Sequence, residues 1–416
     1  MRLATHFFES SFIVSIYRSE SLFLATELHA RAAGIPRSTA LVARREYAED
    51  AAAPVPGSDE EVAYLRRWQQ TLYRAGWCGL TWPESYGGQG AGFVEQVIYD
   101  EEMARAQAPE LINKVGVNNV GPTLIAHGTE EQRHRFLSNI LSAEDIWCQL
   151  FSEPGAGSDL ASLRTRAERD GDGYRLTGQK VWTSYAHFSR WAICLARTDP
   201  EAAKHKGITY FIVDMQAPGI EIRPLRQLTG SAEFNEVFLD AVYVCRELVI
   251  GRENQGWQVA MNTLAHERGT GYLFKEQVKA KIAVDRLVEL VRARARDGAP
   301  VHRALREEVV RAYVRVEILR LLNLDTMTRL ARGQAPGAES SLKKEFWTRL
   351  VQHLHETTLA VEGPHSQLMA GDPLAVDGGR WQQTFLYSRS QSISGGTSEV
   401  QMNIIASRML NLPKGN

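Results

Sequence analysis

The chain has 416 residues, a formal net charge of −1 and four cysteines, Cys78, Cys148, Cys194 and Cys245. This length is enough for two or three domains with a large buried core. The balanced charge excludes an overall field that attracts nucleic acid or an anionic membrane, and no apolar run has the length of a membrane span. The cysteines form no CxxC pair and no cluster with histidine, so we expect no metal site and a reducing compartment. A disulfide between distant cysteines is the less favoured alternative.

The N-terminal segment, residues 1–40, is expected to be irregular. Charged residues such as Glu9 and Arg18 interrupt its apolar runs, which leaves no core for a signal peptide. A cytoplasmic location in a bacterium, or a mitochondrial matrix location in a eukaryote, suits the chain.

Helical patterning extends to about residue 145. Ser58 with Glu61 is a candidate capping box, and Thr129 with Gln132 gives a second helix-start signal. One helical face follows the first signal: Leu65, Trp68, Leu72 and Ala75. The Pro- and Gly-bearing stretch 82–88 is expected to be a loop.

Short β-rich runs replace this pattern between residues 146 and 250. They are residues 174–177, 192–196, 208–213 and 237–239, with glycines at the turns between them. No helical segments separate the runs, so a small barrel or sandwich is favoured over a parallel dinucleotide-binding sheet.

Helical patterning returns after Gly256. One apolar stripe comprises Leu305, Val309, Ala312, Val316 and Leu319. Glutamates interleave with the arginines of residues 292–311, which favours a solvated helix face or a subunit contact over a nucleic-acid patch. We therefore predict an α+β chain with an N-terminal helical domain (1–145), a small β-barrel (146–250) and a C-terminal helical bundle (251–416).

The loop Phe151–Asp159, with the sequence FSEPGAGSD, has chemistry of its own. Ser152 and Ser158 supply hydroxyls, and Gly155 and Gly157 let a ligand approach the backbone closely. The loop is neither a dinucleotide fingerprint nor a nucleophile elbow, since the glycine spacing of both is missing. By itself it predicts either a ligand cradle or a plain structural turn.

Three motifs, taken in order along the chain, resemble the acyl-CoA dehydrogenase family. They are GLTWPESYGG (79–88), LFSEPGAGSD (150–159) and SGGTSEVQ (394–401). The resemblance extends from about residue 60 to residue 413 and implies the helical, β-barrel, helical arrangement. It also implies an enzyme that binds FAD and an acyl-CoA and passes electrons to an electron-transfer flavoprotein.

The resemblance implies flavin contacts from the second of these motifs and from the segment KVWTS (180–184) just downstream. The backbone of Phe151 and Ser152 would line the isoalloxazine ring, Trp182 would pack beside it, and Ser184 would hydrogen-bond near the reactive flavin nitrogen. Ser158 would lie where the flavin diphosphate meets the coenzyme A arm. The alternatives are a core aromatic for Trp182 and a strand hydroxyl for Ser184.

The C-terminal motif would complete the site. Thr397 and Glu399 would meet the flavin from the C-terminal side. The backbone N–H of Gly395 could bond the thioester oxygen, although glycine there cannot be the base that many relatives carry at this position. The family has a second position for that base, which Glu267 matches, and Arg268 would lie near the coenzyme A arm. A surface salt bridge is the alternative for either residue.

Two departures from the family pattern bear on assembly. Many relatives carry an Arg followed by Phe-Gly, which grips the flavin of a neighbouring subunit, whereas residues 292–300 lack Phe-Gly. The Gly-rich segment that completes this grip is altered around residues 361–364. We expect a homodimer or homotetramer, with a hetero-oligomer as the alternative.

Two other functions compete with that of a self-sufficient dehydrogenase. They are a non-catalytic or half-site subunit and an acyl-CoA oxidase.

Overall fold

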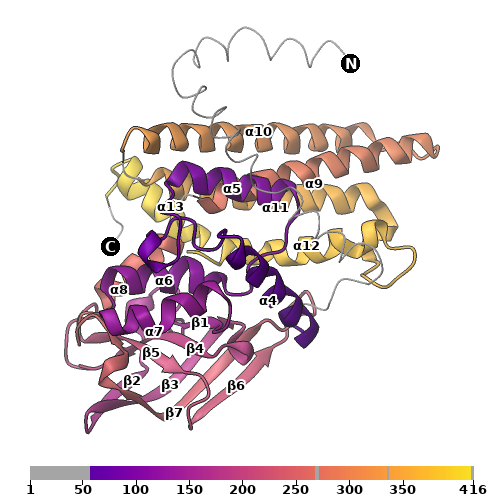
Figure 1. The fold of residues 1–416 in the computed structure, drawn as a ribbon. Helices are drawn as coiled ribbons and strands as arrows, with labels where there is room; N and C mark the ends of the chain where they lie inside the picture. Colours follow the sequence, from indigo (N-terminus) through magenta and orange to yellow (C-terminus); the bar gives the residue numbers. More distant parts are fainter. Residues whose placement is uncertain (1–56, 268–270, 335–336, 414–416) are drawn as a thin grey trace.

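The computed structural model describes residues 57–267, 271–334 and 337–413. The segment 1–40 that was expected to be irregular lies outside the described residues, as does Arg268. Figure 1 shows a lower part, formed by the sheet and the helices packed on it, below a bundle of long helices. The prediction of a middle β domain between two helical domains is confirmed.

The N-terminal domain is built on α4 (Asp59–Arg74), α5 (Phe93–Arg105), α6 (Gly121–His127) and α7 (Glu130–Leu141). Short turns of other helix types, η1 (Glu84–Tyr86) and η2 (Gly116–Val120), lie between them. Thr129 and Gln132 form the predicted capping box of α7. At α4 the box is incomplete. Ser58 accepts from the Glu61 N–H, but the Glu61 carboxylate accepts from the N–H of Gly57 instead of that of Ser58.

The eight strands of the middle domain form one sheet, ordered β6-β7-β3-β2-β4-β5-β8, with β1 beside β4. Their bounds are β1 (Trp147–Leu150), β2 (Arg166–Asp170), β3 (Gly173–Ser184), β4 (Trp191–Arg197), β5 (Ile208–Asp214), β6 (Ile220–Leu225), β7 (Phe234–Cys245) and β8 (Val249–Ile250). Short helical turns η3 (Leu160–Ser162), η4 (Ala186–Phe188) and η5 (Arg246–Leu248) connect them. All four predicted runs lie within strands, and β1 pairs with β4 in parallel.

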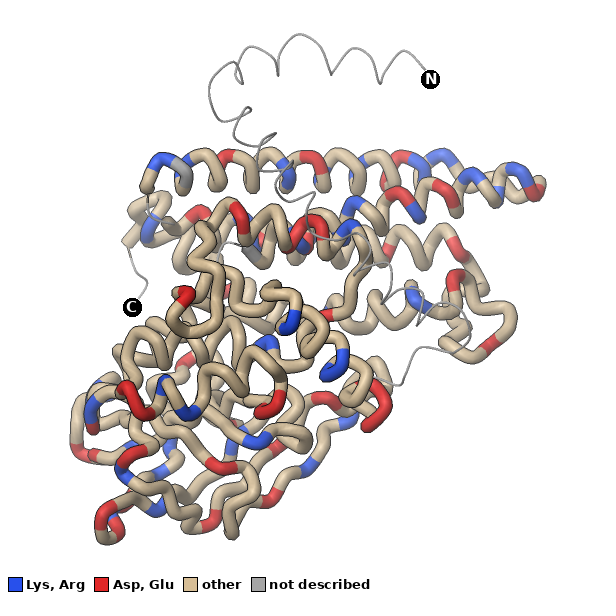
Figure 2. The backbone as a smooth tube through the Cα atoms, viewed as in Figure 1, with Lys and Arg blue, Asp and Glu red and all other residues tan. Residues whose placement is uncertain are grey.

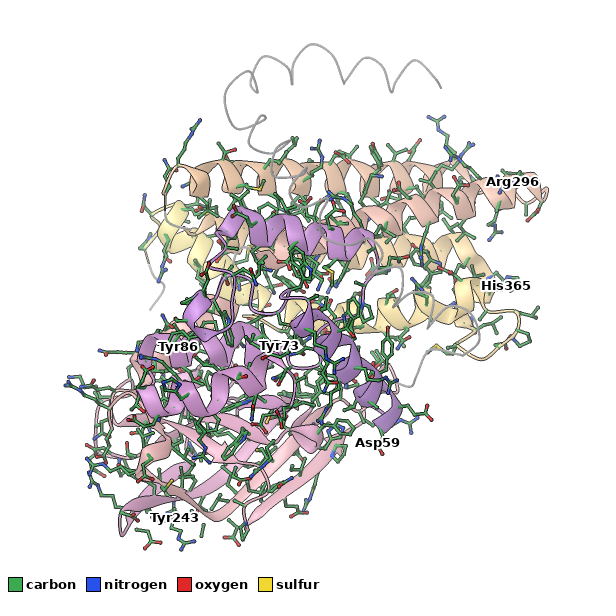
Figure 3. The ribbon with its side chains drawn as sticks, viewed as in Figure 1. Asp59, Tyr73, Tyr86, Tyr243, Arg296 and His365 are labelled. Atoms are coloured by element: carbon green, nitrogen blue, oxygen red, sulfur yellow. The ribbon has the colours of Figure 1, made fainter. Side chains whose placement is uncertain are left out.

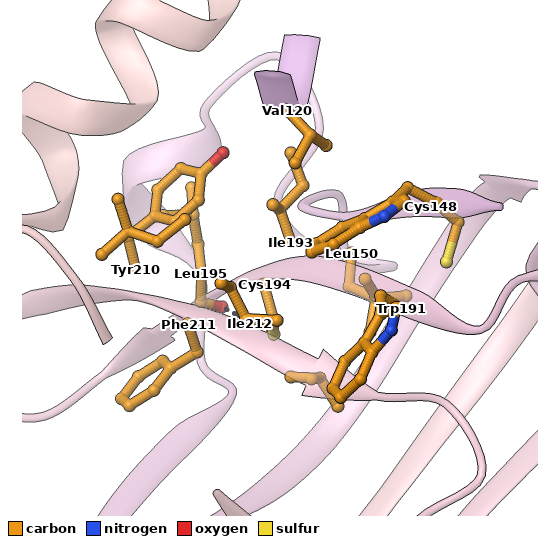
Figure 4. Close-up of a cluster of buried hydrophobic side chains, with 14 of the residues drawn as sticks. Val120, Cys148, Leu150, Trp191, Ile193, Cys194, Leu195, Tyr210, Phe211 and Ile212 are labelled. Atoms are coloured by element: carbon orange, nitrogen blue, oxygen red, sulfur yellow. Dashed lines mark hydrogen bonds between the residues drawn. The ribbon is translucent and has the colours of Figure 1, made fainter. Parts of the chain in front are cut away.

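The main core lies between this sheet and the helices α6 and α7. Strands β4 and β5 are buried along nearly their whole length, which explains their unbroken apolar sequences. Phe136 of α7 packs edge-to-face against Trp147 and Trp191, with ring centroids 5.2 Å apart in both pairs. Figure 4 shows Val120 above Ile193 in this cluster, with Tyr210 and Trp191 on opposite sides.

The C-terminal domain contains α8 (Gly256–Glu267), α9 (Gly271–Arg296), α10 (Arg303–Ala331), α11 (Glu339–Glu362), α12 (Arg380–Ser388) and α13 (Ser398–Ile404). Short segments η6 (Gly363–Gln367), η7 (Val376–Gly379), η8 (Arg389–Ser392) and η9 (Ile405–Met409) complete it. The predicted stripe on α10 is buried from Val309 to Leu319. Helix α5 lies against α9, so an N-terminal helix joins the C-terminal bundle (Figure 1).

Lys and Arg positions alternate with Asp and Glu positions along the chain in both the sheet part and the long-helix bundle (Figure 2). Along α10 the arginines pair with glutamates one turn away, as in Arg303–Glu307 and Arg320–Glu317. This pairing of opposite charges counts against a nucleic-acid patch. No described helix combines the length and apolar character needed to cross a membrane.

Candidate active site

The loop after β1 is open where a ligand would need space. Pro154, Gly155 and Gly157 are exposed, and a methyl group built on either glycine would meet no atom within 4 Å. Ser158 is exposed at the outer part of the loop. At the inner end, the ring of Phe151 is buried and packs edge-to-face on Tyr210 at 5.7 Å. The loop is therefore anchored at one end and accessible at the other.

A buried ion pair lies beneath the loop. The Lys180 ammonium, on β3, is fully buried and lies 2.8 Å from the Glu153 carboxylate. It also donates to the carbonyl oxygens of Phe151 at 3.1 Å and Leu195 at 2.8 Å. Burial would raise the pKa of Glu153, but Lys180 and the donors of Thr165 and Arg164 hold that pKa below its usual value. The pair was not singled out from the sequence, although Lys180 follows the inward period of β3.

Trp182 lies on a β-bulge, because the register of β3 against β7 shifts between Lys180 and Thr183. Its backbone is left-handed, with φ of 60°, and its side chain is 62% exposed. A positive φ at a bulky residue is strained and uncommon, so the surrounding structure must impose it. The indole contacts only one ring in the described residues, Phe234, edge-to-face at 6.3 Å.

The loop and the end of β3 meet, as the sequence analysis expected. The Val181 N–H donates to the Ser152 carbonyl at 2.9 Å, one residue before Trp182. Ser184 is half-buried at the end of β3. The backbone of Ser152 therefore lies next to the end of β3, which carries the exposed indole of Trp182 and the half-buried Ser184.

Glu267 is the last residue of α8, and the structure describes its backbone but not its side chain. One turn earlier, the buried Thr263 hydroxyl lies 2.8 Å from that of Thr123 and 3.0 Å from that of Tyr210. Tyr210 also contacts Phe151, so a continuous set of contacts fixes the end of α8 relative to the loop after β1.

The C-terminal motif forms a turn that leads into α13. Gly395 and Gly396 have φ of 63° and 92°, a conformation that disfavours a glutamate at position 395. The Lys344 ammonium, on α11, donates to the carbonyls of Gln391 at 2.7 Å and Gly396 at 2.9 Å. Gln401 donates to Gly395 and Gly396 from the other side. From the sequence, Lys344 was not singled out and Gln401, the last residue of the motif, was given no role.

Thr397 caps α13, since its side chain accepts from the N–H of Val400 at 3.2 Å. Glu399 is exposed in the first turn, where backbone and Thr397 hydrogen bonds lower the pKa of its carboxyl. In the described residues, no hydrogen bond or ion pair joins this motif to the loop after β1. The loop lies in the middle domain, and the motif lies in the C-terminal domain, where Lys344 of α11 bonds it.

The segments that differ from the family pattern are tied to each other. Arg294, near the end of α9, donates to the carbonyl of Val361 at the end of α11. Figure 3 shows Arg296 and His365 at the same end of the long-helix bundle.

A separate surface cavity has a volume of about 290 Å³. Its lining includes Arg66, His187 and Met215 and contains none of the predicted site residues.

The sequence matches three domains of one family along almost its whole length. Residues 40–144 match the acyl-CoA dehydrogenase N-terminal domain, 148–242 the middle domain and 254–410 the C-terminal domain. The chain belongs to the acyl-CoA dehydrogenase family, whose members are generally FAD-dependent. It is accordingly an enzyme of acyl-CoA dehydrogenation.

Among its relatives, acyl-CoA dehydrogenase IpdE1 of Mycobacterium tuberculosis is 43% identical over 360 residues, which cover 86% of this chain and 91% of that protein. Acyl-CoA dehydrogenase FadE34 of the same organism is also 43% identical, but this chain spans only 47% of its length. Two solved structures are similar at 30% identity: the Tcur3481-Tcur3483 steroid acyl-CoA dehydrogenase, with a TM-score of 0.79, and the ChsE4-ChsE5 complex from M. tuberculosis, with a TM-score of 0.77. They cover 96% and 94% of this chain, and 99% and 98% of the matched chains.

Proposed function

We propose that this chain binds FAD against the loop after β1 and the end of β3, and removes the α-proton of a bound acyl-CoA with Glu267. The observation that carries the proposal is the surface formed by Ser152 and the exposed, strained Trp182. Gly155 and Gly157 leave space beside the loop, so its backbone can contact a planar, polar ring system.

Each predicted site residue would have a separate role in the reaction. The carboxylate of Glu267 accepts the α-proton, and the Gly395 N–H bonds the thioester oxygen, where negative charge develops. Bound FAD supplies the acceptor for the hydride from the β-carbon. Ser184 and Thr397 would orient the flavin, with Glu399 beside it. Ser158 and Arg268 would contact the coenzyme A arm. The product is a trans-2-enoyl-CoA, and we expect the electrons to pass to an electron-transfer flavoprotein.

Glu267→Gln tests the base. We expect kcat to fall on the order of 10²–10⁴-fold, as for loss of a general base, while the flavin content stays unchanged. Glu253→Gln is the matched control, because Glu253 pairs with Arg169 on the surface of the middle domain. Near-normal turnover in Glu267→Gln would remove Glu267 as the base. Peroxide formation without an added acceptor would favour the oxidase alternative.

The substrate class is proposed from the relatives. One of the similar structures is named a steroid acyl-CoA dehydrogenase, so we expect a bulky, ring-bearing acyl group. Flavin bleaching with ring-bearing, short, branched and long acyl-CoAs checks this expectation. Faster bleaching with a straight-chain substrate than with any ring-bearing one would contradict it. A cytoplasmic location remains a prediction.

A second candidate function is that of a half-site subunit, which needs a different chain to complete its flavin site. The Arg294–Val361 contact and the missing Phe-Gly favour a half-site subunit. The names of the two similar structures point the same way, since each name joins two proteins. Helix α10 offers a docking face, since it exposes an apolar stripe: Val310, Tyr313, Val314, Ile318 and Leu321 are 40–60% exposed.

Flavin content distinguishes the two assemblies. A yellow, catalytically active protein purified alone supports the homo-oligomer. A colourless protein that gains flavin only with a second family member supports the half-site subunit. Val314→Glu should dissociate either assembly without unfolding the chain, because this side chain is 48% exposed.

A further inference from the structure

We propose that Lys180 is a positioning residue that raises the reduction potential of bound FAD, acting through the Phe151–Ser152 peptide. The inference rests on the proposed function, since it requires the isoalloxazine ring to lie against this peptide. It concerns a lysine that no expected step of the reaction uses.

The Lys180 ammonium has a fixed geometry. Its three hydrogen-bond acceptors are the Glu153 carboxylate at 2.8 Å, the Leu195 carbonyl at 2.8 Å and the Phe151 carbonyl at 3.1 Å. An ammonium group has three donors, so every one of them has a partner. The side chain is 0% exposed, and the cation therefore acts in a medium that screens it poorly.

The counter-ion, the Glu153 carboxylate, has hydrogen-bond donors of its own. Glu153 accepts from the Thr165 N–H at 2.9 Å, the Thr165 hydroxyl at 2.6 Å and the Arg164 N–H at 2.6 Å. A buried pair of this kind adds little stability compared with apolar residues of similar size. Folding alone therefore does not explain why a charged group is placed on the Phe151 carbonyl.

The peptide that receives this hydrogen bond faces the proposed ring. In a trans peptide the C=O and N–H point in opposite directions, so the Ser152 N–H points away from Lys180. The described residues offer this N–H no hydrogen-bond acceptor. The next carbonyl, of Ser152, is held by the Val181 N–H at 2.9 Å, which prevents the peptide from rotating.

The electrostatic consequence has a definite sign. A cation on the carbonyl polarises the peptide and makes its N–H a stronger donor. The flavin ring gains negative charge when it accepts a hydride, and a preorganised donor stabilises that charge. Lys180 therefore favours reduced over oxidised flavin, because it bonds the Phe151 carbonyl directly, whereas the Glu153 carboxylate bonds Lys180, Thr165 and Arg164.

The test compares flavin midpoint potentials by anaerobic dye equilibration. The double variant Lys180→Gln with Glu153→Gln removes both charges and keeps hydrogen-bonding groups. We expect the ratio of reduced to oxidised flavin at a fixed solution potential to fall at least tenfold, which is about 30 mV for a two-electron couple. Lys343→Met is the control, because it removes another buried lysine from a different domain and should leave the potential unchanged.

The outcomes separate this inference from the proposed function. Wild-type protein that binds no flavin, alone or with a partner chain, overturns the proposed function. A double variant with normal flavin content and an unchanged potential overturns the role of Lys180 alone. If the double variant does not fold, Lys180→Arg and the single Glu153→Gln decide. The first should keep the wild-type potential and the second should raise it, and an unchanged potential in Glu153→Gln again refutes the inference.

Discussion

Replacing the buried Lys343 by methionine should stabilise the protein at neutral pH. Lys343, on α11, is 2% exposed and forms no ion pair in the described residues. Its ammonium donates to the Thr326 hydroxyl at 2.8 Å and lies 5.7 Å from the centre of the Phe274 ring. Burial lowers the pKa of Lys343 from 10.5 to about 8. The folded state therefore binds this proton less tightly than the unfolded chain does.

The magnitude follows from the shift. A change from 10.5 to about 8 corresponds to about 3 kcal/mol of destabilisation at pH 7, since each pKa unit is about 1.4 kcal/mol. Loss of the hydrogen bond to Thr326 offsets about 1 kcal/mol of the gain. Thr326 keeps its own bond to the Leu322 carbonyl, so no donor is stranded. We expect Lys343→Met to gain about 1–3 kcal/mol at pH 7.

Urea unfolding at several pH values measures this gain. The folded pKa is depressed, so the cost of the charged lysine is complete below about pH 8 and disappears as the pH rises above 10.5. The advantage of Lys343→Met should therefore shrink between these values. A variant that is less stable than the wild type at pH 7, or an advantage that grows with pH, would refute the reasoning.

Three further outcomes concern a buried carboxyl, an anchoring lysine and a helix cap. Burial raises the pKa of Glu362 from 4.5 to about 7, so its stabilising proton is lost as the pH rises through 7. The free energy of unfolding of Glu362→Gln, measured in urea, should therefore exceed that of the wild type by up to about 3 kcal/mol at pH 8 and equal it at pH 4.5. Lys344→Gln should weaken the bonds to Gln391 and Gly396 and lower kcat/KM at least tenfold with flavin still bound, whereas unchanged kinetics would count against an anchoring role. Thr397→Ala should cost about 1 kcal/mol of unfolding free energy through the lost cap of α13, and Thr397→Ser should restore it.

Local features were predictable because neighbouring residues set them. The capping box at Thr129 needs only residues three positions apart, and the stripe on α10 needs only helical periodicity. The loop after β1 could be singled out from its glycines and hydroxyls. The loop alone could not separate a ligand cradle from a structural turn, because Trp182, the aromatic next to its Ser152 contact, lies on β3.

The sequence by itself determined the order of helical and β regions, the polar loop and the candidate base at the end of α8. Tertiary structure decided which distant groups meet. Three contacts join residues more than 25 positions apart: the parallel pairing of β1 with β4, the hydrogen bond from Lys180 to Phe151 and the hydrogen bond from Lys344 to Gly396. Such contacts depend on how whole elements pack, because buried charges need partners that only the assembled fold brings within hydrogen-bond distance.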